Sequence, residues 1–333
     1  MTGIERLVVR APNWLGDAVM ALPAIAAVRR AFASSVLVVA APRSVAPLFE
    51  EVTEARPDGV VVVERDWEIA QLRAANAQAV LLFPNSFHSA WNARRAGFRE
   101  RWGFAGGGRS WLLTRAARRP RGHIHQTEYY RQLVRGVGID ADDLPPRLDV
   151  SAGSRAAADR LLRDRISAGQ ALVGFAPGAA YGHAKRWPPD RVAEVAARVV
   201  RRGGAAVFVG AAADRETGRA IESTLPPDVH AINLIGRTTL GQLVGVIARC
   251  SAFVSNDSGA MHVAAALGVP LTALFGPTDE RRTAPRGPAA ADVMRRDVFC
   301  RPCMLRECPI DHRCMKRIGV DDVCESVARH LGW

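Results

Sequence analysis

The chain of 333 residues contains no hydrophobic run of the roughly 18 residues that a membrane-spanning helix needs. Its first residues also lack the apolar stretch of a secretory signal peptide. We therefore expect a cytoplasmic protein. With 48% hydrophobic and 23% charged residues, the composition is that of a globular protein. The length suits two domains of about 150 residues each.

Lysine is almost absent. Of the 45 basic residues, only Lys185 and Lys316 are lysines, and the others are arginines. An internal lysine in such a chain is a candidate for a role that needs a compact point charge. The 33 acidic residues leave a formal net charge of +12, which favours an anionic partner. Nucleic acid, a membrane surface and a phosphorylated substrate all fit that charge. No recognised nucleic-acid-binding motif accompanies it, so we expect no nucleic-acid partner.

Two common nucleotide-binding motifs are also missing. No G-x-G-x-x-G follows the first apolar run, and the sequence G-x-x-x-x-G-K-[ST] occurs nowhere. The first absence argues against a dinucleotide-dependent dehydrogenase, and the second argues against a P-loop nucleotidase.

Apolar runs that are typical of buried strands alternate with helical patterns in both halves of the chain. Such continuous runs suit parallel sheets that are covered by helices on both faces. A Pro- and Ser-rich change of character at residues 144–154 indicates a boundary. We predict an α/β protein of two doubly wound, Rossmann-like domains, residues 1–150 and 151–333, with a site in the cleft between them. The predicted strands are 6–10, 36–40, 60–63, 79–83, 172–176, 205–209, 232–235, 252–254 and 271–275, and the predicted helices include 18–32, 189–202, 240–250 and 320–331.

A carboxylate stands where the first strand passes into the first helix. Asp17 follows Asn13, Trp14 and Gly16 at the carboxyl end of that strand, which is where open α/β sheets bind their ligands. We expect Gly16 to allow a tight turn that a side chain would obstruct. Asp17 is therefore a candidate catalytic residue. The alternative, equally well supported by position alone, is that Asp17 only caps the helix.

Two loops of small residues in the second half each join a strand to a helix. Backbone N–H groups in such loops, together with Lys185 as a point charge, could hold a phosphate or diphosphate. The alternatives are a solvated connecting loop around Lys185, helix capping by Asp257 or Ser258, and a packed surface histidine at His262. The residues of this candidate site are Gly178, Ala179, Lys185, Asp257, Ser258, Gly259, Ala260 and His262.

The stretch from Arg94 to Arg121 is strongly basic, with nine arginines against the single acid Glu100. Trp102, Phe104 and Trp111 are interleaved with these arginines. Such a stretch suits a phosphorylated acceptor at an anionic membrane surface, or equally a solvated face of an arginine-rich protein.

Five of the six cysteines lie late in the chain. Cys300, Cys303, Cys308 and Cys314 are close in sequence, with His312 nearby, and Cys324 follows. In a cytoplasmic protein such a group favours a metal over disulfides, and structural zinc is one interpretation. The other is a compact loop of reduced thiols.

Three motifs in this order resemble glycosyltransferase family 9. They are residues 13–20, residues 177–179 with 185–188, and residues 256–262 with 275–278, and the likeness extends from Arg10 to about Arg317. The resemblance implies a GT-B architecture of two Rossmann-like domains that face each other across a cleft. It also implies an inverting, metal-independent transfer from ADP-heptose, bound mainly by the second domain, to a saccharide bound mainly by the first.

The resemblance also implies roles for individual residues. Asp17 would take the proton of the acceptor hydroxyl, and Lys185 with nearby N–H groups would stabilise the departing diphosphate. No cofactor is then required, and a structural zinc stays open. The implied acceptor is a lipid-linked inner-core saccharide that bears phosphates or Kdo, met at the inner face of the cytoplasmic membrane. The residues assigned to it are Asn13, Trp14, Arg94, Arg95, Arg99 and Arg101.

Two alternatives remain open at this point. One is a transferase of the same family that uses another nucleotide sugar or another acceptor. The other is a non-catalytic protein that binds anionic glycans on the same scaffold. A binding protein has no need for a carboxylate at Asp17, so substitution of that residue distinguishes catalysis from binding.

Overall fold

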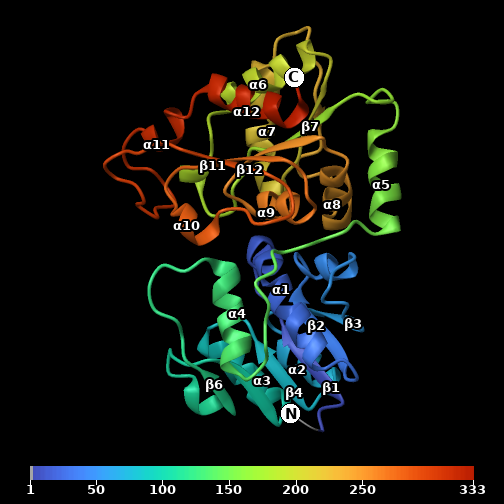
Figure 1. Ribbon diagram of the computed structural model, residues 1–333, viewed down its shortest axis with the longest axis vertical. Coiled ribbons are helices and arrows are strands. Elements are labelled where there is room, and N and C mark those ends of the chain that lie inside the picture. The colour runs from blue at the N-terminus through green and yellow to red at the C-terminus, as the bar shows by residue number, and fades with distance from the viewer. Residues whose placement is uncertain (1–2) are drawn as a thin grey trace. The chain divides into compact units, whose positions relative to one another are not determined.

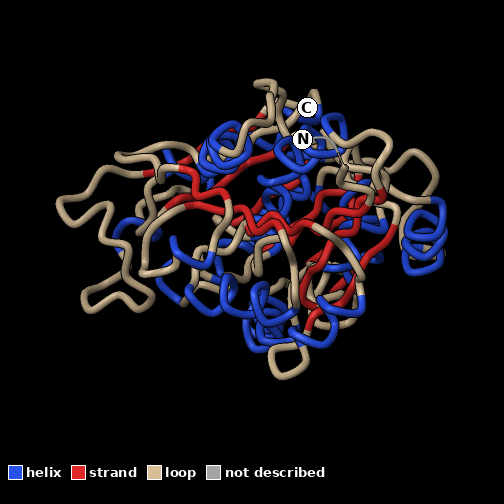
Figure 2. The backbone as a smooth tube through the Cα atoms, turned by 90° about the horizontal axis from the view of Figure 1, so that it is seen from below, coloured by secondary structure: helices blue, strands red, loops and turns tan. Residues whose placement is uncertain are grey.

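The computed structural model describes residues 3–333, and the chain divides between Asp149 and Val150 into two compact units. Each unit contains one six-stranded parallel sheet with helices around it (Figure 1). Figure 2 shows helices on either side of the strands. The predicted α/β class with doubly wound parallel sheets is confirmed.

The sheet of the first unit has the strand order β3-β2-β1-β4-β5-β6. The central strand β1 pairs in parallel with β2 and β4, so that Leu7 lies opposite Leu37 on one side and Ala79 on the other. The strands are β1 (Arg6–Arg10), β2 (Val36–Pro42), β3 (Gly59–Val63), β4 (Ala79–Leu82), β5 (Glu100–Phe104) and β6 (Arg115–Ala117). The helices are α1 (Leu15–Ala31), α2 (Glu68–Ala74), α3 (Phe87–Ala96) and α4 (Gln126–Gly136), with short 3-10 helices η1 (Ala46–Glu50) and η2 (Ser110–Leu112).

The sheet of the second unit has the order β12-β11-β10-β7-β8-β9. Its strands are β7 (Leu172–Ala176), β8 (Ala205–Phe208), β9 (Ile232–Asn233), β10 (Ala252–Asn256), β11 (Leu271–Phe275) and β12 (Ala291–Arg295). Its longer helices are α5 (Ala152–Leu162), α6 (Pro189–Arg201), α7 (Arg215–Thr224), α8 (Leu240–Ala248), α9 (Gly259–Ala266) and α12 (Val320–Leu331). The short ones are η3 (His183–Lys185), η4 (Ala212–Asp214), α10 (Glu280–Thr283) and α11 (Arg313–Lys316).

Both sheets therefore follow the same doubly wound order, in which the first strand of each unit lies between the second and the fourth. The direction of winding reverses between β1 and β4 in the first unit and between β7 and β10 in the second. At such switch points the loops at the carboxyl ends of the strands separate and leave a crevice for a ligand. Each unit thus offers one such place, at the loops that follow these strands.

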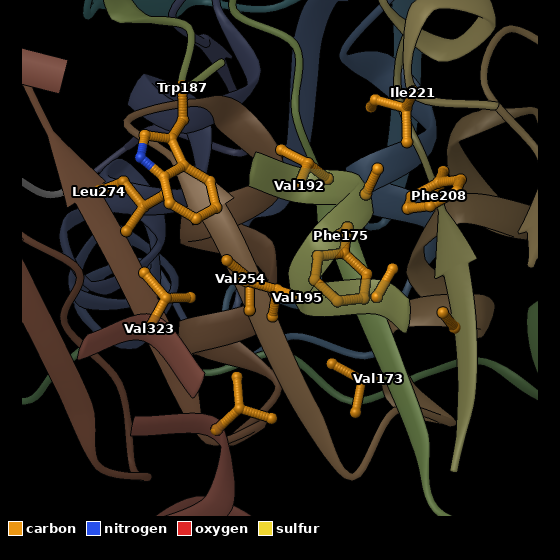
Figure 3. Close-up of a cluster of buried hydrophobic side chains, with 14 of the residues drawn as sticks. Val173, Phe175, Trp187, Val192, Val195, Phe208, Ile221, Val254, Leu274 and Val323 are labelled. Atoms are coloured by element: carbon orange, nitrogen blue, oxygen red, sulfur yellow. The ribbon is translucent and has the colours of Figure 1, made fainter. Parts of the chain in front are cut away.

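The core of the second unit lies between its sheet and helix α6 (Figure 3). Val192 and Val195 of α6 face Phe175 and Phe208 of the sheet, whose ring centroids are 5.7 Å apart. The last helix, α12, packs on α6 and on β10 and β11, and its Val323 is fully buried. This helix completes the core of the second unit.

Several local predictions were wrong in detail. Helix α1 begins at Leu15, and Gly16 is part of its first turn, so Gly16 does not form the predicted tight turn. Strands β5, β6 and β12 were not predicted, because charged residues interrupt their apolar pattern. Within β5, Trp102 and Phe104 are buried in the core of the first unit rather than displayed on a basic surface.

Candidate active site

Asp17 lies in the first turn of α1, directly beyond the carboxyl end of β1. The residue that caps this helix is Trp14, which is extended and whose side chain makes no capping hydrogen bond. Asp17 is therefore not the N-cap residue that the alternative interpretation required. A carboxylate in the first turn is stabilised by the positive end of the helix dipole. The side chain of Trp14 is 61% exposed, and Asn13 is exposed beside it.

A tyrosine from another helix contacts the Asp17 carboxylate. The Tyr130 hydroxyl of α4 donates a hydrogen bond to Asp17 Oδ1 over 3.2 Å. Tyr130 is buried, and its ring lies 5.3 Å from that of Phe83 at the end of β4. Burial, and then the neighbouring Asp17 charge, raise the pKa of Tyr130 well above its ordinary value. Tyr130 thus stays protonated and keeps its role as a donor. Sequence reasoning missed this residue.

A buried ion pair holds the segment between β1 and α1 that precedes Asp17. Arg10, the last residue of β1, donates from Nε to Glu68 Oε1 over 2.7 Å and from Nη2 to Asn13 Oδ1 over 2.8 Å. Asn92 donates to the other Glu68 oxygen over 3.0 Å. Because Arg10, Glu68 and Asn92 are all buried, each polar group depends on these partners. The network fixes Asn13, which lies two residues before the start of α1 at Leu15.

In the second unit, Lys185 and Asp257 meet at the switch point. Lys185 follows β7 and Asp257 follows β10, and Lys185 Nζ lies 2.6 Å from Asp257 Oδ2. The two side chains are only 11% and 6% exposed. Thr278, which follows β11, donates to the same Asp257 oxygen over 2.7 Å. Lys185 Nζ also lies 4.7 Å from the centre of the Tyr181 ring. Lys185 is therefore a held cation rather than a solvated charge on a loop.

The loop that carries Lys185 is fixed by Trp187 and Asn256. The Trp187 indole is fully buried beside Leu274 (Figure 3), and its Nε1 donates to the Ile318 carbonyl over 3.2 Å. The Trp187 backbone N–H donates to Asn256 Oδ1 over 3.3 Å, and Asn256 Nδ2 donates to the Pro177 carbonyl over 2.6 Å. One buried asparagine thus holds both ends of this loop.

Gly178 at the start of the loop packs against a buried carboxylate. A Cβ atom at Gly178 would lie 2.3 Å from Asp214 Oδ2, which no side chain can accommodate. Asp214 in turn pairs with Arg186 over 3.2 Å and accepts the Ala211 N–H over 3.1 Å. Asp214 thus contacts both Gly178 and Arg186, the residue that follows Lys185 in the chain. Asp214 was not predicted. Ala179 is buried beside Gly178.

The second small-residue loop ends at the start of α9. Ser258 is its N-cap residue, but its side chain makes no capping bond and its Oγ lies 3.1 Å from Ser255 Oγ. The first N–H groups of a helix, here those that begin at Gly259 and Ala260, have no acceptor within the helix. His262 is 4% exposed within α9, so it is not a surface histidine. Asp257 contacts Lys185, and Ser258 follows Asp257 directly in the chain. Their use as a diphosphate site stays a prediction.

The cysteine-rich segment lies between β12 and α11. All its cysteines are free thiols, and the Cys314 thiol is buried against the core, where burial raises its pKa. Within residues 3–333, no group of three or more His, Cys, Asp or Glu side chains is arranged to hold a metal ion. One reason is that Cys314 packs with Met315 in the hydrophobic core. The zinc site gains no support from this geometry, and elemental analysis of protein purified without chelator tests it.

The same segment supports the Lys185 loop, which the sequence did not predict. The Tyr181 hydroxyl donates to the Met304 carbonyl over 2.6 Å, and the Ala184 N–H donates to the Arg306 carbonyl over 2.9 Å. Gly182 has a φ of 156°, and a Cβ there would lie 2.3 Å from the Arg306 carbonyl oxygen. Residues 304–306 therefore pack along the Lys185 loop.

The arginine-rich stretch separates into buried and exposed members. Arg109 is 1% exposed and donates to the Pro84 carbonyl over 2.6 Å, and burial lowers its pKa to about 10. Arg101 is partly buried and donates to the Leu112 carbonyl over 2.7 Å; burial, and then Arg94, lower its pKa. Among the predicted acceptor arginines, Arg94, Arg95 and Arg99 are exposed.

Three exposed aromatic side chains gather beside these arginines. Phe87 and Trp91 of α3 stack with ring centroids 6.2 Å apart, and Trp111 of η2 lies 6.4 Å from Phe87. The Arg94 guanidinium lies 5.9 Å from the centre of the Trp111 ring. We call Phe87, Trp91 and Trp111 the aromatic cluster. Of the helices in residues 3–333, none is long and apolar enough to cross a membrane.

The chain is similar to known proteins over most of its length. Residues 68–313 match the model of glycosyltransferase family 9 (heptosyltransferase). The chain is 35% identical over 299 residues to lipopolysaccharide heptosyltransferase 2 of Escherichia coli K12, which covers 84% of this chain and 85% of that protein. It is 30% identical over 290 residues to lipooligosaccharide heptosyltransferase 2 of Haemophilus influenzae, covering 82% and 84%. The solved structure of E. coli ADP-heptose lipopolysaccharide heptosyltransferase II matches with a TM-score of 0.83 and 32% identity over 98% of both chains.

The resemblance drawn from the three motifs is thereby confirmed. The family match covers most of the chain, and the structural match extends over both units. The strand order of the two sheets is that of two Rossmann-like units, and the architecture is GT-B. The chain therefore belongs to glycosyltransferase family 9, the heptosyltransferases.

Proposed function

We propose that the protein moves a heptose from ADP-heptose to a lipid-linked saccharide of the lipopolysaccharide inner core, with inversion and without a catalytic metal. The observation that carries this proposal is the chemistry of the two switch points. One presents the Asp17 carboxylate and the other presents the Lys185 ammonium beside the start of α9. The E. coli relative of known structure is described as an ADP-heptose transferase, which supports the choice of donor.

On the acceptor side, Asp17 takes the proton of the attacking hydroxyl. As that oxygen forms its bond to the anomeric carbon, the bond from this carbon to the diphosphate oxygen breaks on the opposite face of the sugar. A single displacement of this kind inverts the configuration, and it needs a general base rather than a second carboxylate nucleophile. The dipole of α1 and the Tyr130 hydroxyl favour the ionised form of Asp17 that this role requires.

On the donor side, negative charge develops on the departing ADP. Lys185 and the first N–H groups of α9 supply charge stabilisation to the diphosphate oxygens. Asp257, whose carboxylate also accepts a hydrogen bond from Thr278, holds the ammonium in place before the donor arrives, so that little reorganisation is needed during the reaction. Asp257 thus positions Lys185, and its own carboxylate is turned to the ammonium rather than to the diphosphate.

The acceptor belongs to the first unit in this proposal. Its phosphates or acidic Kdo sugars are bound by Arg94, Arg95 and Arg99, which are exposed, while Asn13 and Trp14 lie near Asp17. Arg101 takes part only through its partly buried guanidinium. The aromatic cluster next to Arg94 combines exposed indoles with positive charge, which is a composition suited to the headgroup region of an anionic membrane. We place the protein at the inner face of the cytoplasmic membrane.

Calorimetric titration with ADP, UDP, GDP and CDP in EDTA tests the donor assignment. Selective binding of ADP is expected. A preference for another nucleotide would preserve the family and overturn the donor, and no binding of any nucleotide would favour the glycan-binding alternative.

The Asp17→Asn variant tests the base. It should abolish transfer and leave the dissociation constant of ADP nearly unchanged, because the amide keeps the shape of the side chain but cannot accept the proton. Asp140→Asn, an exposed substitution in the same unit, is the matched control. Equal loss of transfer and of ADP binding in Asp17→Asn would contradict the base assignment.

A further inference from the structure

Tyr130 carries a hydroxyl that packing alone does not require. Its ring fills the space beside Phe83 and Tyr129, with centroids 5.3 Å and 5.8 Å away, and phenylalanine would fill that space equally well. A hydroxyl buried to this degree is unfavourable unless it is hydrogen-bonded. Its partners are the Gln126 side chain, which donates to it, and Asp17, to which it donates. The hydroxyl is therefore oriented toward the carboxylate by its own helix.

We propose that Tyr130 is a positioning residue for Asp17. The inference rests on the proposed function, in which Asp17 accepts the proton of the acceptor. By donating to Oδ1 over 3.2 Å, Tyr130 fixes the plane of the carboxylate and stabilises its anionic form. Tyr130 joins α4 to the first turn of α1, so the packing of these two helices contributes to the direction of the base.

The adjacent tyrosine provides a matched comparison. Tyr129 accepts a hydrogen bond from Asn85 Nδ2 over 2.8 Å, and its ring packs 4.6 Å from that of Phe104. The titratable groups that act on Tyr130 are Asp17 from α1 and Tyr129 from its own helix. Tyr130→Phe and Tyr129→Phe therefore remove the same atom from neighbouring positions, and only the first removes a donor to Asp17.

The experiment measures transfer kinetics of both variants with ADP-heptose and a soluble inner-core acceptor across the pH range. Tyr130→Phe should lower kcat about tenfold, the loss of one hydrogen bond to a charged group, while KM for either substrate changes less than about twofold. The acid limb of its kcat profile should move to higher pH, because a carboxylate without its donor is protonated more readily. Tyr129→Phe should retain the kcat and the acid limb of the parent protein.

Several results would overturn the inference. Tyr130→Phe with an unchanged kcat and an unmoved acid limb would show that the hydroxyl does not act on the base. A lower melting temperature with no kinetic change would show that it only joins the helices. If Tyr130→Phe does not fold, Gln126→Ala is the second test, because it removes the hydrogen bond from Gln126 to the hydroxyl and leaves the tyrosine in place. Gln126→Ala should lower kcat by about threefold and move the acid limb to higher pH. An unchanged kcat and acid limb in Gln126→Ala would also overturn the inference. Activity in Asp17→Asn would refute the proposed function itself, whereas an inactive Asp17→Asn with an unaffected Tyr130→Phe would refute only this inference.

Discussion

Replacement of Lys185 by methionine tests the donor half of the site most directly. Methionine keeps an unbranched stem beside the Tyr181 ring and removes only the ammonium. Two interactions are then lost together, the one to the diphosphate and the one to Asp257. The Asp257 carboxylate is 6% exposed, and after the change the Thr278 hydroxyl still donates a hydrogen bond to its Oδ2. A negative charge that was neutralised by Lys185 would then face the incoming donor.

The magnitude follows from these contacts. A hydrogen bond to a charged group contributes about 1.5–3 kcal/mol, so its loss alone weakens ADP binding roughly ten- to 150-fold. Repulsion from the unpaired Asp257 adds to this loss, and we expect the upper part of that range. Removal of one partner from a buried ion pair also lowers the free energy of unfolding, by about 3–5 kcal/mol where no other group compensates. Because Thr278 still donates to Asp257, we expect the lower end of this stability range.

Calorimetric titration with ADP and thermal unfolding measure both effects. The double variant Lys185→Met with Asp257→Asn should recover part of the stability and part of the affinity, because the unpaired carboxylate is gone. Lys316→Met, at the other lysine of the chain, is exposed on α11 and should change neither quantity. Unchanged ADP affinity in Lys185→Met would refute the phosphate role. A double variant no more stable than Lys185→Met would refute the role of Asp257 as a charge that needs Lys185.

Two further predictions concern the first unit. Asp58 accepts the Leu37 N–H and pairs with Arg29, and the Leu37 hydrogen bond, with help from Arg29, lowers the pKa of Asp58 below its ordinary 3.8. The stabilisation by the Asp58 carboxylate is therefore complete above that ordinary value and is lost as the pH falls through the lowered pKa. Asp58→Asn should have a lower melting temperature than the parent protein at pH 7, and this difference should disappear below about pH 4. A difference that does not depend on pH would contradict this. Replacing Trp91 and Trp111 by serine should reduce co-sedimentation with phosphatidylglycerol vesicles but not with phosphatidylcholine vesicles, and unchanged binding to the anionic vesicles would exclude the aromatic cluster as the membrane contact.

The parts of the fold that could be predicted are those where hydrophobicity alone decides the structure. Strands β1, β7 and β11 lie in the sheet interior, are apolar along most or all of their length, and have the predicted bounds. Strands β6 and β12 lie at sheet edges, where side chains are partly solvated and an apolar run is not required. Strand β5 was hidden because Glu100 and Arg101 precede its buried Trp102.

The site was predictable only where local sequence carries the chemistry. Asp17, Lys185 and Asp257 each stand at a connection from a strand to a helix, so their types and positions indicated a function. The sequence could not indicate that Asp257 binds Lys185, since 72 residues separate them. Nor could it indicate Tyr130, which is 113 residues from Asp17. These contacts form because the order of the strands in the sheet brings distant segments of the chain together. The hydrophobic periodicity of the sequence does not predict the strand order.

The packing of residues 304–306 along the Lys185 loop has a consequence for attempts to change the specificity for the proposed donor. Tyr181, Gly182 and Ala184 are each matched to the backbone of that segment, at Met304 or Arg306. A loop transplanted from a relative with another donor would arrive without its matching wall, and Gly182 would tolerate no larger replacement. The two segments, more than a hundred residues apart, therefore form one exchangeable unit, and chimaeras that move them together should retain a folded Lys185 loop where single-segment grafts lose it.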